Sequence, residues 1–152
     1  MTSPTNIRLQ HDTRDIDWHE LELLFKAAEL GGREGDKLRR AFENSQVVCL
    51  VFAGTRLIGA ARALTDFEYH ATVYDVVIHP DYQRQGIGAA LMREVLKRLP
   101  VWRVLLVADG DAARFYGRLG FQPYGDVMAL LDRSQGLLLR AFPNFFFRKE
   151  SQ

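Results

Sequence analysis

The sequence predicts a mixed α/β fold, in which helices cover both faces of one mostly antiparallel central sheet. Its 152 residues, 47% apolar and 26% charged, suit a single globular domain with one core. The apolar periodicity indicates a strand, two helices and three successive strands, and then a helix, a strand, a helix and a last strand. A meander followed by a strand–helix–strand unit produces a sheet of mixed direction, for which we expect about six or seven strands and about four helices.

The first half of the chain supplies one edge of this sheet and two helices. Gly31-Gly32 ends the first helix at the position of a C-terminal cap, and Asp36 can cap the second helix. Residues 31–35 therefore form a flexible link, which can border the mouth of a substrate site. The predicted elements are a strand over residues 5–10, helices over 15–30 and 36–43, and a hairpin of strands over 46–52 and 57–64.

The second half is organised around a strand, a loop and a helix between residues 73 and 99. Residues 73–78 are apolar at both odd and even positions apart from Asp75, which indicates a strand covered on both faces. The glycines of the loop over 83–88 let several N–H groups converge on an anion beside the positive end of the helix dipole. This pattern predicts a pyrophosphate cradle. The remaining predicted elements are a strand over 102–108, a helix over 111–119 and a strand over 127–131.

The loop does not fit two familiar phosphate-binding motifs. A Walker A loop requires Gly-Lys-Ser/Thr, which is absent, and a dinucleotide fingerprint requires Gly or Ala where Leu91 stands.

Charge and composition argue against several partners. Lys and Arg total 20 against 19 Asp and Glu, so a net charge near +1 gives no footprint for nucleic acid or an anionic membrane. The N-terminal residues lack a signal design, and no apolar run approaches the ~18 residues of a membrane span, so we expect a cytoplasmic protein. The single cysteine, Cys49, lies in an apolar run and predicts a buried thiol. The histidines lack metal-ligand spacing, and no metal is assigned.

Residues 134–152 are too apolar for a solvated tail, because seven large apolar side chains fall within eleven positions there. We expect one domain over residues 1–133 and a C-terminal extension over 134–152. The extension is expected to pack on the domain or on a second copy of the chain, with a homodimer favoured.

Two motifs resemble those of the GCN5-related N-acetyltransferase (GNAT) family. Ile78 to Gly88 reads Ile-x-Pro-x-x-Gln-x-x-Gly-x-Gly and is similar to the family's acyl-CoA-binding motif, with Gln83 where the family often has arginine. Asp111 to Phe121 resembles the family's Ala-x-x-Phe-Tyr-x-x-x-Gly-Phe helix. The resemblance implies the GNAT fold over roughly residues 7–131, with central strands that splay apart into a cleft.

The resemblance also implies acetyl-CoA as cofactor and assigns roles to the motif residues. The implied cofactor-binding residues are Val76, Val77, Ile78, Gln83, Arg84, Gln85, Gly86, Ile87, Gly88, Ala89, Phe115 and Tyr116. Tyr116 is expected to protonate the departing CoA thiolate, because core packing alone would accept phenylalanine at that position.

Asp75 is the carboxylate best placed to serve an acceptor amine. Alkylammonium groups have a pKa of ~10, so acetyl transfer to an amine needs a base. An unpaired charge in a strand buried on both faces is costly, so Asp75 is assigned to catalysis or amine binding. The alternative is a structural ion pair with an arginine such as Arg62. His70 and Tyr74 are alternative bases or relays, and His79 is a weaker candidate.

Within the family, residues 61–66 and 71–76 resemble the plastid and cyanobacterial serotonin-type N-acetyltransferases. This favours an enzyme that transfers an acetyl group directly to a small aryl or alkyl amine in a ternary complex, with polyamines, amino acids and protein lysines as other acceptors. The alternative function is a non-catalytic acyl-CoA-binding sensor or regulatory module.

Overall fold

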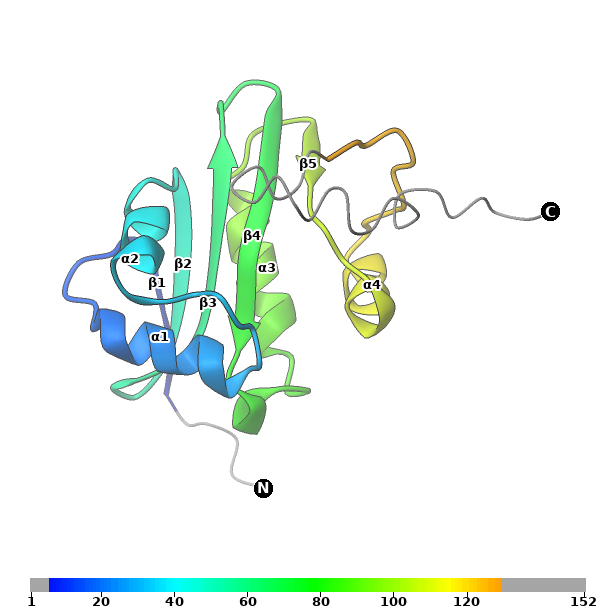
Figure 1. Ribbon diagram of the computed structural model, residues 1–152. Coiled ribbons are helices and arrows are strands. Elements are labelled where there is room, and N and C mark those ends of the chain that lie inside the picture. Colours follow the sequence, from blue (N-terminus) through cyan, green and yellow to red (C-terminus); the bar gives the residue numbers. More distant parts are fainter. Residues whose placement is uncertain (1–5, 130–152) are drawn as a thin grey trace, which may run out of the picture. The chain divides into compact units, whose positions relative to one another are not determined.

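The computed structural model describes residues 6–129, which contain five strands, four α-helices and one short 3-10 helix (Figure 1). Contacts divide the chain into two units, Met1–Phe115 and Tyr116–Gln152, with the boundary inside the last helix. The predicted mixed α/β fold is confirmed. The predicted count of about six or seven strands is too high for the described residues. Val127 and Met128 are exposed and lack the alternating burial of a strand, and residues 130–131 lie outside the described part.

The sheet has the order β1-β2-β3-β4-β5. Strands β1 to β4 pair antiparallel and β5 pairs parallel with β4, as a meander followed by a crossover predicts. Strand β2 is buried almost throughout, because α3 (Ile87–Lys97) covers one of its faces and Val48, Leu50 and Phe52 on the other face join the core of the first two helices. The strands are β1 Ile7–Gln10, β2 Val47–Ala53, β3 Arg56–Thr65, β4 His70–Ile78 and β5 Arg103–Leu105.

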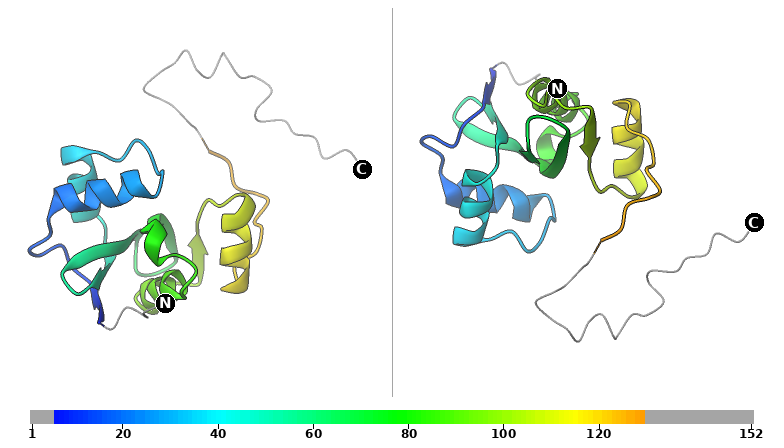
Figure 2. Two further views of the ribbon diagram at one scale, coloured as in Figure 1. Left: turned by 90° about the horizontal axis from the view of Figure 1, so that it is seen from below. Right: turned by 90° about the horizontal axis from the view of Figure 1, so that it is seen from above.

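Helices α1 (Trp18–Ala27) and α2 (Gly35–Glu43) cover one face of the sheet, and α3 (Ile87–Lys97) covers the other (Figure 2). Phe25 of α1 and Phe42 of α2 meet edge to face in the core below α1 and α2. On the opposite side, α3 contacts β2, β3 and β4 through an apolar stripe that is fully or nearly fully buried. The last helix, α4, spans Gly110–Arg118.

The ends of α1 and α2 differ from the sequence prediction. Helix α1 ends at Ala27, and Glu29 rather than a glycine takes the left-handed conformation after it, with a φ of 59°. The capping role predicted for Asp36 is wrong, because the helix begins at Gly35 and its N-cap residue is Glu34. Asp36 therefore lies in the first turn, where its negative charge still interacts favourably with the positive end of the helix dipole.

Cys49 is completely buried in β2, as predicted, and burial raises the pKa of its thiol to about 11. The thiolate form is therefore scarce at neutral pH, and the thiol is expected to be unreactive in the folded protein. Within residues 6–129, no helix has both the length and the apolar character needed to cross a membrane.

Candidate functional site

The N-terminus of α3 is arranged to receive an anion. Its N-cap residue, Gly86, has a φ of 79° and a ψ of 0°, a left-handed conformation that glycine adopts without strain. No side chain caps this end of the helix within the described residues. The first N–H groups of an α-helix have no intrahelical acceptor, so these groups and the positive end of the dipole are available to a phosphate.

Two glutamine side chains fix the loop that leads into α3. Gln83 Nε2 donates to the carbonyl oxygen of Ile78 at 2.9 Å, and Gln85 Nε2 donates to that of Asp81 at 3.1 Å. Gln83 thus ties the loop to the end of β4, and within the described part of the chain its second amide proton and its oxygen remain for a ligand. Arg84 is exposed, with a φ of 59°, and supplies a cation to the loop.

Strand β4 continues beyond its parallel neighbour. Only His70–Thr72 of β4 pair with Arg103–Leu105 of β5. Residues 73–78 have no strand on that side within the described part of the chain, which agrees with the predicted splaying of the two strands. Backbone groups along such an edge can hydrogen-bond to an extended ligand.

A β-bulge in β4 turns Asp75 toward β3. Ala60 pairs with Val77 and Arg62 pairs with Tyr74, so β4 carries one more residue than β3 between these pairs. Asp75 takes a φ of 54°, which breaks the normal alternation of side chains. As a result, Tyr74 and Asp75 both contact Arg62, whose guanidinium lies 5.1 Å from the centre of the Tyr74 ring.

Both carboxylate oxygens of Asp75 accept hydrogen bonds from arginine. Arg33 Nε donates to Oδ1 at 2.7 Å, and Arg62 Nε donates to Oδ2 at 2.6 Å. The Asp75 side chain is only 4% exposed, so these ion pairs compensate a nearly buried charge. The ion pair with Arg62 that the sequence suggested as an alternative is therefore present, and any role of Asp75 toward an amine is exerted from within this cluster.

Helix α4 brings Phe115 to the first turn of α3. A Cβ atom at Gly88 would lie 3.4 Å from Phe115 Cζ and 3.6 Å from Ile78 Cγ1. These are ordinary van der Waals distances, so Gly88 lies directly against the Phe115 ring and Ile78. Three residues predicted to bind cofactor meet at this point.

Tyr116 belongs to the second unit, where its ring packs edge-on against Phe121 with a centroid distance of 5.8 Å. Partial burial raises the pKa of the Tyr116 phenol above its ordinary value. The phenol is therefore protonated throughout the neutral range, which is the state that a general acid requires.

The alternative bases differ in their distance along the chain from Asp75. His70 lies at the start of β4 with its ring 5.5 Å from that of Trp102. His79 lies just beyond the other end of the strand, where its Nδ1 accepts a hydrogen bond from the Asp81 N–H. Tyr74 alone of these candidates is adjacent to Asp75 and shares its contact with Arg62.

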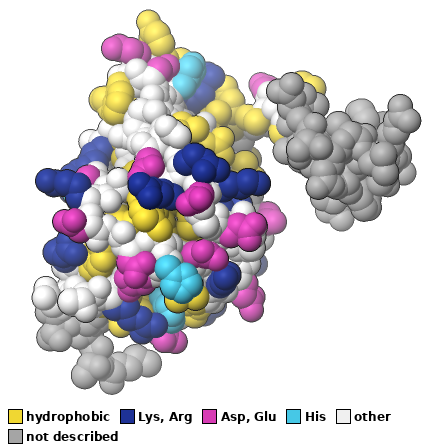
Figure 3. All heavy atoms as spheres, turned by 60° about the vertical axis from the view of Figure 1, so that its left-hand side comes forward, with side chains coloured by type: hydrophobic (Ala, Val, Ile, Leu, Met, Phe, Trp, Pro, Cys, Tyr) yellow, Lys and Arg dark blue, Asp and Glu magenta, His cyan; other side chains and the backbone are white. Residues whose placement is uncertain are grey.

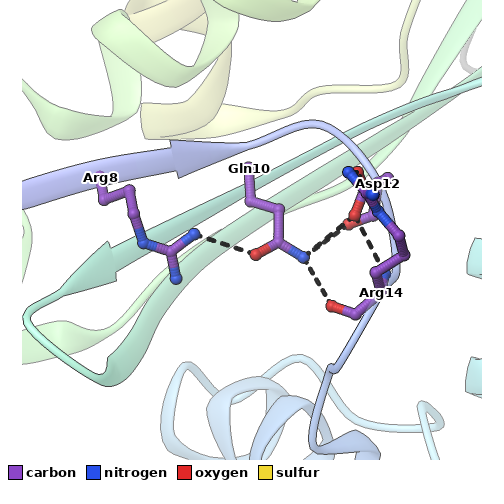
Figure 4. A network of polar contacts seen from close by, with 4 residues as sticks. All are labelled: Arg8, Gln10, Asp12 and Arg14. Atoms are coloured by element: carbon purple, nitrogen blue, oxygen red, sulfur yellow. Dashed lines mark hydrogen bonds and ion pairs between the residues drawn. The ribbon is translucent and has the colours of Figure 1, made fainter.

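A separate hollow of about 850 Å³ lies beside β1 and the start of α1. Its polar groups largely bond to one another (Figure 4). Gln10 accepts from Arg8 Nη1 at 3.0 Å and donates to the Arg14 carbonyl at 2.8 Å, while Arg14 is ion-paired with Asp12. These four side chains are thus paired with one another, and no predicted site residue lines the hollow.

Comparison with known proteins identifies the family and the fold. The family model described as the acetyltransferase (GNAT) family matches residues 11–121, a range that holds β4, the α3 loop and α4. The chain belongs to the GNAT family.

Two relatives of this GNAT domain carry acetyltransferase names. The uncharacterized N-acetyltransferase ycf52 of Porphyra purpurea is 35% identical over 72% of this chain and 67% of its own length. Serotonin N-acetyltransferase 2, chloroplastic, of Oryza sativa subsp. japonica is 32% identical over 74% of this chain and 60% of its own length.

A solved structure shows the same fold. A probable acetyltransferase from meticillin-resistant Staphylococcus aureus matches this GNAT domain with a TM-score of 0.73 and 21% identity, over 82% of this chain and 98% of that one. At that identity the likeness concerns the fold alone.

Arg33 is the site residue that sequence reasoning missed. It lies 42 positions before Asp75 in the chain, so no local motif connects the two residues. The available signal was a lone cation inside the glycine-rich link over 31–35, which the sequence had placed at the mouth of a substrate site.

The loop geometry gives a first test of this GNAT site. Gly86→Val places a β-branched side chain at a φ of 79°, where L-residues are strained by ~1–2 kcal/mol, and is expected to distort the cradle. Acetyl-CoA is expected to raise the Tm of the wild-type protein, and this rise should be lost in the variant. Gly54→Val is the matched control, because Gly54 also has a positive φ and open space around it but lies in the β2–β3 turn. An undiminished shift in folded Gly86→Val would remove the loop from the acetyl-CoA site.

Proposed function

We propose that this protein binds acetyl-CoA and transfers its acetyl group directly to a primary amine in a ternary complex, with small aryl or alkyl amines favoured. The observation that carries the proposal is the N-terminus of α3, which no side chain caps, together with an edge of β4 that has no strand neighbour, both within residues 6–129. The helix N-terminus suits a pyrophosphate, and the strand edge suits an extended chain that ends in a thioester.

The residues around this edge fit the parts of acetyl-CoA. The pyrophosphate would be held by the N–H groups from Gly86 to Ala89 and by the Arg84 guanidinium, because its negative charge is opposite to their positive charge. Backbone groups of Val76, Val77 and Ile78 would bond to the pantetheine amides along the free edge of β4. Ile87 is buried and fixes the first turn of the helix, so its contribution is positional.

Acetyl transfer forms an N–C bond and breaks a C–S bond. The ammonium nitrogen loses two protons, one before it attacks and one to water after the N–C bond has formed, and the sulfur gains one. The acceptor amine is protonated at neutral pH, since its pKa is ~10, and must lose a proton before its lone pair can attack the carbonyl. Asp75 would hold the ammonium group and take up that proton or pass it to water. Tyr116 would donate its phenolic proton to the departing sulfur and be reprotonated from solvent.

A second candidate function is a non-catalytic acyl-CoA sensor. The double pairing of Asp75 favours it, because a carboxylate that already accepts hydrogen bonds from two guanidinium groups can serve a structural role alone. Such a protein would bind acetyl-CoA at the α3 loop but would release no CoA thiol in the presence of amines.

A thiol-release screen separates these two functions. Wild-type protein and acetyl-CoA would be incubated with aryl amines, polyamines, amino acids and lysine peptides, and free CoA would be measured together with the acetylated product. Amine-dependent release with matching product supports the enzyme. Tight acetyl-CoA binding without release across all four classes would support the sensor.

We further propose that the protein is a homodimer built through residues 134–152, which lie outside the described residues. The support is the sequence, because seven large apolar side chains within eleven positions are costly to leave in water. Ending the chain after Arg133 should lower the solution mass from two copies to one, as measured by light scattering. A full-length protein of monomeric mass would reject the dimer.

We place the enzyme in the cytoplasm. The chloroplastic name of the rice relative makes the plastid the alternative, and fractionation of the source cells distinguishes the two locations.

A further inference from the structure

The two arginines that bind Asp75 are held to very different extents. Arg62 is 14% exposed; besides its bond to Asp75 it donates to Ser45 Oγ at 3.3 Å and lies over the Tyr74 ring. Arg33 is 44% exposed, and Asp75 is the one partner that the structure gives it within residues 6–129. Arg62 is thus a fixed counter-charge, whereas Arg33 is attached to the cluster by a single ion pair.

The glycines on both sides of Arg33 have open space around them. In Figure 1 the link between α1 and α2 passes in front of β4. Within this link, a Cβ atom added at Gly31, Gly32 or Gly35 would meet no atom within 4 Å. The link is tied at its two ends, where the Leu30 N–H donates to the Phe25 carbonyl and the Gly35 N–H donates to Glu22. Arg33 can therefore leave Asp75 without any change in the core.

We propose that Arg33 occupies the place of the acceptor's ammonium group on Asp75 Oδ1, and that a cationic acceptor binds by displacing it. This inference rests on the proposed function and names how its site selects substrates. Arg33 acts through Asp75 and is a specificity-determining residue rather than a catalytic one.

The charge balance of the cluster explains why the incoming group must be a cation. Two guanidinium groups (+2) and one carboxylate (−1) give a net charge of +1. An ammonium group that replaces Arg33 preserves this balance and keeps the nearly buried carboxylate paired on both oxygens. A neutral acceptor would leave Oδ1 without a charged partner, so it would have to bind elsewhere and leave Arg33 in place.

The residue that precedes Asp75 also suits an amine that carries an aryl or alkyl group. Tyr74 is the residue before Asp75 on the strand and is 39% exposed. Part of its ring is therefore open to contact with an apolar group or a cation. The site therefore offers a carboxylate for the ammonium and an aromatic surface beside it.

Binding measurements on two matched ligands test this exchange. 2-Phenylethylamine and its neutral analogue 2-phenylethanol would be titrated by calorimetry into CoA-saturated wild-type protein and into Arg33→Gln, Arg33→Lys and Arg39→Gln. A partly exposed ion pair opposes a competitor only weakly, so Arg33→Gln should bind the amine about two- to fivefold more tightly. The KM for the amine should fall by the same factor, while kcat and the KM for acetyl-CoA stay constant.

The controls separate displacement from other effects. Arg33→Lys keeps a competing cation and should return the affinity toward the wild-type value. Arg39→Gln removes an arginine of α2 that pairs with Glu43 and should change nothing. 2-Phenylethanol should bind all four proteins alike. An amine affinity that is unchanged or weaker in Arg33→Gln, or no amine binding by any of these proteins, overturns the inference. If amine binding follows the expected pattern but no acetyl group is transferred, the proposed function fails and the displacement of Arg33 stands.

Discussion

Asp75→Asn is expected to lose about 10²-fold or more in turnover and about 3 kcal/mol in the free energy of unfolding. The stability falls because Arg62 is nearly buried and loses its counter-charge. The oxygen of asparagine can accept from one guanidinium group, whereas its NH2 is a donor and cannot pair with the other. Turnover falls further than acetyl-CoA affinity, since Asp75 is proposed to serve the amine. Steady-state kinetics, acetyl-CoA titration and denaturant unfolding measure the three quantities.

The pH dependence of the Asp75→Asn variant identifies the step that is lost. If Asp75 takes up the proton of the amine, the variant should recover part of its turnover as the pH rises toward ~10, where the amine loses its proton in solution. A role confined to holding the ammonium group would instead leave the deficit constant or increase it at high pH.

Two further variants separate stability from chemistry. Arg62→Gln removes the fixed partner but keeps the carboxylate, so it should lose stability while retaining more turnover than Asp75→Asn. Asp12→Asn breaks the exposed pair with Arg14 and should leave turnover unchanged. Wild-type turnover in folded Asp75→Asn would return Asp75 to a purely structural role.

The elements that the sequence predicted well are those with local signals. The apolar stripe of α3 and the glycines before it determine both the helix and its uncapped N-terminus, so position and function are encoded within one segment. The antiparallel meander was predicted in the same way, because each turn joins strands that are neighbours in the chain. Asp75 was recognised as unusual because it is the one charge in an apolar strand.

The features that escaped prediction depend on contacts between distant segments. The pairing of Arg33 with Asp75 depends on the path of the link across β4, which no residue pattern specifies. The bulge at Asp75 depends on a register offset between β3 and β4. The sequence of β4 is apolar at both odd and even positions, so it does not reveal the extra residue. Strand β5 was predicted too long because its apolar pattern continues past Leu105, although pairing with β4 stops there.

Surface charge agrees with the composition. On the face shown in Figure 3, acidic and basic side chains are interspersed, so neither sign forms a continuous field there. This face therefore adds no long-range steering field to the proposed recognition of a cationic acceptor by Asp75.

Tyr116→Phe is expected to lower kcat by about 10²–10⁴-fold while acetyl-CoA affinity stays nearly constant. The substitution removes one oxygen atom and keeps the ring that packs against Phe121, so stability should change little. Without the phenol, the departing thiolate must take its proton from water. A solvent deuterium isotope effect on kcat identifies conditions in which proton transfer limits the rate, and the comparison should be made there.

The pH profile gives a second, independent signature of the same acid. Burial raises the pKa of Tyr116, so the wild-type phenol keeps its proton until the pH exceeds the ordinary tyrosine value of ~10. The alkaline fall in kcat should therefore lie above pH ~10 in the wild type and be absent from Tyr116→Phe. Tyr124→Phe makes the same chemical change at an exposed tyrosine of the same unit and should preserve both rate and profile. Full turnover in Tyr116→Phe, measured where a chemical step limits the rate, would make Tyr116 a packing residue and assign the proton to water.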